Sequence, residues 1–275
     1  MSSHKLQTTR TCYHCGLKTS HILKCSNCKL WDFKAPYIPK YDYLYTIKDI
    51  YVINLKKDSH RIKSFFNKLS IQNISVGNRQ WKKFTGVDGS NMTEVIDNIN
   101  DLYTDMADKT RIYNHWEKYP GSIGCYLSHL KLWEHILTSN NEYTLIMEDD
   151  SFFTPYGLIN TEILLRSAIN MEWDMLYVGH FLLKGSKVHP LFAKPISVGN
   201  MKGYNTGLFG YIIRKSSIPK LLAITKTFET PFIDVHIRNN FGDTNNHIKA
   251  LFSISDLIRH DHSGKSTRHT IDKTY

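Results

Sequence analysis

Three consecutive carboxylates, Glu148-Asp149-Asp150, directly follow an apolar run at residues 143–147. The run is short enough to be a buried strand. The carboxylates then lie at its carboxyl end, the edge at which open α/β sheets bind ligands. Carboxylates packed this closely repel one another unless a cation neutralises them. The cluster therefore predicts a site for Mg²⁺ or Mn²⁺ that in turn holds a diphosphate. A solvated turn after the strand is the alternative.

Four of the five cysteines form a second set with clear chemistry, two C-x2-C pairs made by Cys12, Cys15, Cys25 and Cys28. Two such pairs supply the four thiolates of a tetrahedral Zn²⁺ site. Metal binding would provide the folding energy that so short a segment cannot obtain from a core. Disulfides are the alternative. They conflict with the cytoplasmic location that is expected because the chain start lacks the hydrophobic stretch of a signal peptide.

Composition limits the classes of partner. The net charge of +10 would suit nucleic acid, an anionic membrane or a phosphorylated ligand. The basic residues are scattered with no long block, however, so nucleic acid is not the expected partner. No apolar stretch approaches the roughly 20 residues that span a bilayer. The abundance of Lys, Asn and Ile is typical of an AT-rich genome, such as that of a large virus.

The elements that position these groups suggest an α/β domain behind a small module. We expect a zinc-binding module at residues 1–33, a linker at 34–46 that contains prolines between aromatic residues, and a catalytic domain at 47–275. The domain opens with a β-branched strand at residues 50–55. A helix follows whose apolar face contains Ile62, Phe65, Phe66 and Leu69. Strand, short loop and helix in this order begin an α/β nucleotide-binding layout.

A second helix is expected to start near Gly121 and to continue through Leu137. Ser128 and His129 fall off its apolar stripe and are placed near the amino-terminal end, where backbone N–H groups and the helix dipole favour anions. A hydrogen-bonded structural histidine is the alternative for His129.

The order of motifs over roughly residues 48–240 resembles glycosyltransferase family 25, which holds lipooligosaccharide and collagen hydroxylysine galactosyltransferases. The matching stretches are 52–55 with Asp58 and Arg61, 84–89, 121–129 with Trp133, 148–150, 173–174, 210–213 and 231–234. Such a constellation is far more specific than any single motif. The cysteine module is not part of the family pattern.

The resemblance implies a GT-A-type nucleotide-sugar-binding sandwich, here preceded by a small four-cysteine zinc ribbon. It also implies a UDP-sugar donor, Mn²⁺ (or Mg²⁺) and inversion at the anomeric centre, which requires a base for the acceptor hydroxyl. Asp234 matches the late acidic position and is the expected base. Binding of the acceptor sugar, or capping of a helix that begins at Val235, is the alternative role.

The remaining site residues follow from the same resemblance and from the acidic cluster. Glu148 and Asp150 are the expected manganese ligands together with His262, although His260 and Asp261 compete for that third position. The expected donor-binding residues are Asn54, Leu55, Arg61, Asp88, Gly89, Ser128, His129 and Asp149.

The sequence therefore predicts a metal-dependent inverting glycosyltransferase that moves a hexose, galactose or glucose, from a UDP-sugar to a hydroxyl group of a glycan or glycoprotein. The rival is a nucleic-acid-binding or scaffold protein that acts through the zinc module and carries a degenerate transferase domain. Intact carboxylates at Glu148, Asp149, Asp150 and Asp234 argue against degeneration.

Overall fold

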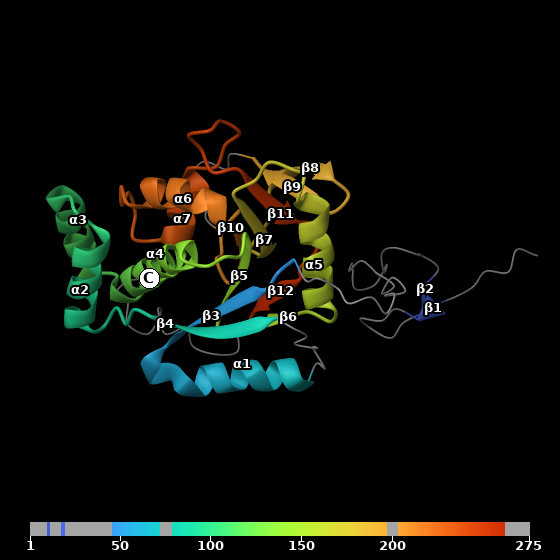
Figure 1. The fold of residues 1–275 in the computed structure, drawn as a ribbon, viewed down its shortest axis with the longest axis horizontal. Coiled ribbons are helices and arrows are strands. Elements are labelled where there is room, and N and C mark those ends of the chain that lie inside the picture. Colours follow the sequence, from blue (N-terminus) through green and yellow to red (C-terminus); the bar gives the residue numbers. More distant parts are fainter. Residues whose placement is uncertain (1–9, 12–17, 20–45, 72–78, 197–202, 262–275) are drawn as a thin grey trace, which may run out of the picture. The chain divides into compact units, whose positions relative to one another are not determined.

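The computed structural model describes residues 10–11, 18–19, 46–71, 79–196 and 203–261 (Figure 1). The chain divides into two units, Met1–Leu44 and Tyr45–Tyr275. The described part of the first unit is an antiparallel pair of short strands, β1 (Arg10–Thr11) and β2 (Lys18–Thr19). The expected zinc ligands Cys12, Cys15, Cys25 and Cys28 and the expected manganese ligand His262 lie outside the described residues. Those assignments stay predictions.

The second unit is built on an eight-stranded sheet with the order β4-β3-β5-β10-β7-β11-β9-β8. β3 lies parallel between β4 and β5, β11 is parallel to β7, and β10 runs antiparallel between β5 and β7. The expected α/β class is therefore confirmed, with a mixed sheet. The strands are β3 (Asp49–Leu55), β4 (Gln80–Gly86), β5 (Tyr143–Glu148), β7 (Met175–Gly179), β8 (Gly185–His189), β9 (Phe192–Pro195), β10 (Gly210–Arg214) and β11 (Ala250–Ser253).

The central strands are mostly apolar, as burial of both faces of the sheet requires. Along β5, Leu145 and Met147 pack into one core cluster and Ile146 into the other, as the two-residue period of a strand requires. Burial on both faces is typical of strands covered by helices on each side. The short apolar run before the carboxylates is thus the buried strand that its sequence predicts.

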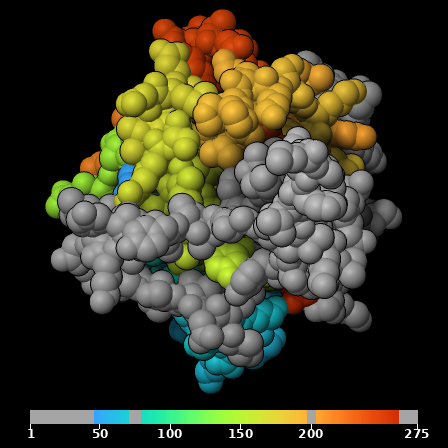
Figure 2. All heavy atoms as spheres, turned by 90° about the vertical axis from the view of Figure 1, so that its right-hand side faces the viewer, coloured from blue at the N-terminus to red at the C-terminus, as the bar shows by residue number. Residues whose placement is uncertain are grey.

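Helices cover both faces of this sheet (Figure 1). Residues of α1 and α5 pack into the cluster that contains Leu145, and residues of α2, α4, α6 and α7 pack into the cluster that contains Ile146. Figure 2 shows α5 and the β8–β9 pair reaching the surface on one face of the molecule. The helices are α1 (Ser59–Ile71), α2 (Met92–Leu102), α3 (Met106–Trp116), α4 (Pro120–Leu137), α5 (Gly157–Ala168), α6 (Ile218–Thr225) and α7 (Ile233–Asn239).

The first helix agrees with its sequence pattern. Ile62, Phe65 and Leu69 are buried on one face of α1, as expected, and Phe66 is half-buried and packs against the same core. A 3₁₀ turn at η1 (Lys56–Asp58) connects β3 to it, and a second one, η2 (Lys215–Ser217), connects β10 to α6. Within the described part of the chain, no helix combines the length and the apolar character that crossing a membrane requires.

The position of Ser128 and His129 in their helix differs from expectation. Because α4 begins at Pro120 and runs to Leu137, both residues lie in its middle and are buried. Their backbone N–H groups belong to the helix interior, so the expected anion site at the helix start does not include them. Proline suits the first turn because its fixed φ is already helical, and it marks the start better than the glycine that follows.

Candidate active site

A cavity of about 280 Å³ lies at the carboxyl ends of β3 and β5. The two strands are parallel neighbours and Ile53 pairs with Glu148, so their ends meet at one edge of the sheet. The loop that leads into β10 and the first turn of α7 complete the cavity wall. The carboxylates that follow β5 therefore line a cavity at the strand edge, where the sequence places them.

Arg61 joins two of the three carboxylates. Its Nη2 lies 2.6 Å from Oδ1 of Asp149 and 2.7 Å from Oδ2 of Asp150. Nδ2 of Asn54 donates to the other oxygen of Asp149 at 2.5 Å. Burial raises the pKa of Asp149 to about 7, although Arg61 and Asn54 act in the opposite direction. The repulsion that predicts a metal ion is thus partly relieved by a guanidinium group of the chain itself.

His260 reaches the cluster through a small second sheet. β6 (Ser151–Phe153) pairs antiparallel with β12 (Ile258–His260), which places His260 opposite Ser151. Nε2 of His260 lies 3.2 Å from Oδ2 of Asp150. This contact raises the pKa of His260. Burial alone would raise the pKa of Asp150, but the contacts with His260 and Arg61 hold it below its usual value.

The structure describes two of the three candidates for the third metal ligand, His260 and Asp261, while His262 lies outside the described residues. His260, Glu148 and Asp150 offer ligand atoms that all lie within 4.8 Å of one another. Asp261 instead contacts Nζ of Lys68 at 2.5 Å. Oδ1 of Asp150 is buried and has no hydrogen-bond partner among the described residues. Two carboxylates, one of them with an unpaired buried oxygen, and an imidazole fit a divalent cation.

Most of the expected donor-binding residues lie together. The cavity is lined by Asn54, Leu55, Arg61, Gly89, Ser128, His129 and Asp149. Asp88 is not among the lining residues, and its carboxylate binds Nζ of Lys57 at 2.7 Å and Ser90.

Ser128 and Gly89 shape the wall rather than offer free polar groups. The hydroxyl of Ser128 accepts from the backbone N–H of Val87 at 2.8 Å and donates to the carbonyl of Gly124 at 2.6 Å. A Cβ on Gly89 would lie 1.7 Å from the carbonyl oxygen of Pro120, so this position accepts glycine alone. Both residues hold the loop after β4 against α4.

Asp234 lines the same cavity from the first turn of α7. Its Oδ2 accepts from the backbone N–H of Gly207 at 3.3 Å and its Oδ1 from that of Val235 at 2.9 Å. Because α7 begins at Ile233, Asp234 does not cap a helix that begins at Val235. Asp234 is separate from the carboxylate cluster in sequence but shares its cavity.

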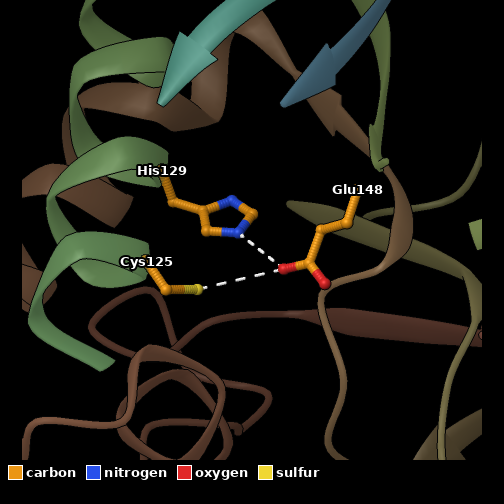
Figure 3. A group of neighbouring side chains, drawn as sticks. All are labelled: Cys125, His129 and Glu148. Carbon is orange, nitrogen blue, oxygen red and sulfur yellow. Dashed lines mark hydrogen bonds and ion pairs between the residues drawn. The ribbon is translucent and has the colours of Figure 1, made fainter. Parts of the chain in front are cut away.

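Sequence reasoning missed one cavity residue with a reactive side chain, Cys125. It precedes His129 by one helical turn, and its Sγ faces Glu148 (Figure 3). The i, i+4 spacing of Cys125 and His129 was the available signal, since such residues share one face of a helix.

Comparison with known proteins assigns the chain to a family. Residues 47–237 match the model of the family described as glycosyltransferase family 25 (LPS biosynthesis protein). A glycosyltransferase 25 family member of Aedes aegypti is 28% identical over 64% of this chain and 28% of its own length. Human procollagen galactosyltransferase 2 is 27% identical over 67% of this chain and 29% of its own length. Human inactive glycosyltransferase 25 family member 3 is 30% identical over 50% of this chain and 23% of its own length.

The matched region thus spans less than a third of the length of each of these relatives. The family model itself covers well over half of this chain, from β3 to α7. The chain belongs to glycosyltransferase family 25.

Proposed function

We propose that this chain is a metal-dependent, inverting glycosyltransferase that moves a hexose from a UDP-sugar to a hydroxyl group. The observation that carries the proposal is one cavity that contains both a divalent-cation ligand set and a separate carboxylate, Asp234. Transfer to a hydroxyl needs a cation, because the leaving diphosphate gains negative charge, and a base, because the acceptor loses a proton.

Glu148, Asp150 and His260 are the residues that would hold the metal. The unpaired Oδ1 of Asp150 gives this set an oxygen that no other described group uses. When bound, the metal supplies Lewis-acid stabilisation of the leaving diphosphate. Carboxylate ligands suit Mg²⁺ and Mn²⁺, and the imidazole favours Mn²⁺ of the two.

The donor nucleotide would contact the end of β3. Asn54 is 1% exposed and lines the cavity, and its Oδ1 has no hydrogen-bond partner in the described part of the chain. A buried acceptor without a partner costs free energy, so a ligand N–H or O–H group at this point is favoured. Arg61 stabilises the neighbouring carboxylates, which places its positive charge close to where phosphate would bind.

Asp234 is the proposed base. Both of its oxygens accept backbone hydrogen bonds, which hold the carboxylate in one orientation toward the cavity. It does not belong to the cation set, which leaves it available for the acceptor. By analogy with the human galactosyltransferase among the relatives, the transferred sugar is galactose or glucose and the acceptor is a glycan or protein. A structural Zn²⁺ in the cysteine module and a cytoplasmic location belong to the same proposal.

A second candidate function is a non-catalytic scaffold, favoured by the human relative that is named inactive. Hydrolysis of UDP-galactose and UDP-glucose, measured with and without Mn²⁺, separates the two. We expect Mn²⁺-dependent release of UDP, which Asp150→Ala should abolish together with Mn²⁺-dependent UDP binding. Absence of hydrolysis and of Mn²⁺-dependent UDP binding by the unaltered chain would favour the scaffold.

A further inference from the structure

A second group of potential ligands lies beside the first. Cys125 and His129 share one face of α4, one turn apart, and Glu148 faces them from the end of β5 (Figure 3). All three line the cavity, and their ligand atoms lie within 4.8 Å of one another. Glu148 belongs to both groups. The carboxylate oxygen that faces the pair is Oε1, while its other oxygen points away from them (Figure 3).

The separations are close to those between ligands of one metal ion. Nε2 of His129 lies 3.4 Å from Oε1 of Glu148, and Sγ of Cys125 lies 3.9 Å from the same oxygen. An N–H···O hydrogen bond is usually about 2.7–3.2 Å long. In a tetrahedral zinc site with bonds of about 2.0–2.3 Å, nitrogen and oxygen ligands are roughly 3.4 Å apart and sulfur and oxygen ligands roughly 3.6 Å. Small side-chain shifts would therefore suffice to close the site.

The histidine is held in the orientation that a ligand needs. Its Nδ1 lies 2.8 Å from the hydroxyl of Tyr211, which also receives a hydrogen bond of 2.8 Å from Nε1 of Trp133. All three side chains are buried. This arrangement directs Nε2 of His129 toward Cys125 and Glu148, and the tyrosine hydroxyl can accept a hydrogen bond from Nδ1–H when Nε2 binds a cation. Such outer partners are usual for metal-binding histidines.

We propose that Cys125, His129 and Glu148 form a binding site for a thiophilic divalent cation of the Zn²⁺ class. A thiolate and an imidazole select such ions over Mg²⁺ and Mn²⁺, so this site differs in preference from the set formed by Glu148, Asp150 and His260. Three protein ligands leave a fourth coordination position, and it faces the cavity because all three residues line it.

Shared use of Glu148 gives the site a regulatory consequence, which rests on the proposed function. A cation bound by Cys125 and His129 would also bind Glu148, which Mn²⁺ needs as a ligand together with Asp150 and His260. Zn²⁺ should therefore inhibit sugar transfer in competition with Mn²⁺, and Cys125→Ser should relieve the inhibition.

The direct test needs no enzymatic activity. Co²⁺, a spectroscopic substitute for Zn²⁺, is titrated into the full chain while thiolate-to-cobalt absorption is recorded. We expect the unaltered chain to bind one more thiolate-coordinated Co²⁺ than Cys125→Ser, since the amino-terminal cysteines are the same in both. His135→Gln is the matched control, because His135 is an exposed histidine of α4 that contacts Tyr51 rather than the cavity. It should bind as much Co²⁺ as the unaltered chain.

A second measurement covers the case in which Cys125→Ser fails to fold. In the unaltered chain, Zn²⁺ should slow alkylation of Cys125 by iodoacetamide, followed by mass spectrometry of the peptide that contains it. Asp150→Ala should keep this protection, because it removes a ligand of the other set only. Equal Co²⁺ binding by folded Cys125→Ser and the unaltered chain, or alkylation of Cys125 that Zn²⁺ does not slow, would overturn the proposal. Neither result bears on the transferase proposal itself.

Discussion

Replacement of Asp234 by asparagine removes a base while it keeps the shape of the side chain. The structural cost is small, because the amide oxygen can keep the 2.9 Å bond from Val235 and only the longer 3.3 Å bond from Gly207 is lost. Loss of one hydrogen bond costs about 0.5–1.5 kcal/mol. For a domain of this size, that lowers the melting temperature by only about 1–6 °C. The variant should therefore fold.

The kinetic cost should be much larger. A carboxylate base contributes about 10²–10⁴-fold to the rate, which corresponds to about 2.7–5.4 kcal/mol of transition-state stabilisation. We expect the rate of sugar transfer to fall by that factor. The affinity for UDP in Mn²⁺ should stay within about twofold, because the variant leaves Glu148, Asp150 and His260 unchanged.

Transfer kinetics and calorimetry of UDP binding, made on the same preparation, decide the matter. Asp243→Asn is the matched control, since Asp243 is an exposed aspartate whose carboxylate binds Lys194 on the surface. It should transfer sugar at the rate of the unaltered chain. Near-normal turnover of Asp234→Asn would remove Asp234 from the reaction. A large loss of UDP affinity would instead assign it to donor binding.

Three further outcomes are expected. Gly124→Ala should destabilise the domain by about 1–3 kcal/mol in urea unfolding, because its Cβ would lie 2.6 Å from the backbone nitrogen of Gly89; unchanged stability would contradict this close packing. Burial lowers the pKa of His236, so the unfolded chain binds more protons and stability should fall as the pH drops below about 6.5. His236→Gln should reduce that acid sensitivity in melting curves, and an unchanged pH dependence would refute the assignment. Metal analysis of Cys125→Ser should still find about one Zn²⁺ per chain, bound by the amino-terminal cysteines; two disulfides and no zinc there would disprove the module.

Much of the cavity could be predicted because its parts follow local rules. β3 and β5 each contain a run of apolar residues, and the polar groups at their ends meet at one edge since parallel neighbours end together. The strand pattern alone therefore predicts that Asn54 and the three carboxylates lie at this edge, where the structure has them. The apolar face of α1 followed in the same way from helical periodicity.

The remaining parts depend on pairing between distant segments. His260 joins Asp150 through two strands of three residues each, which are too short to leave a periodic signal. The reversed direction of β10 depends on its neighbours rather than on its own sequence. Ser128 was misplaced along α4 although the helix start was expected within one residue of Pro120, because a residue two turns from the start no longer has a free backbone N–H group.

The position of Arg61 changes the role that a metal ion is expected to have at the three carboxylates. Repulsion among three carboxylates alone would require a metal ion for the fold to form, but the guanidinium of Arg61 already bridges Asp149 and Asp150. It binds Oδ2 of Asp150 and leaves Oδ1 buried without a partner in the described structure. A cation that binds Oδ1 therefore need not displace the guanidinium. Arg61 then acts as a fixed outer support that orients the carboxylates, as partners of metal ligands commonly do. The metal is thus expected to add function to a site that the chain has already organised.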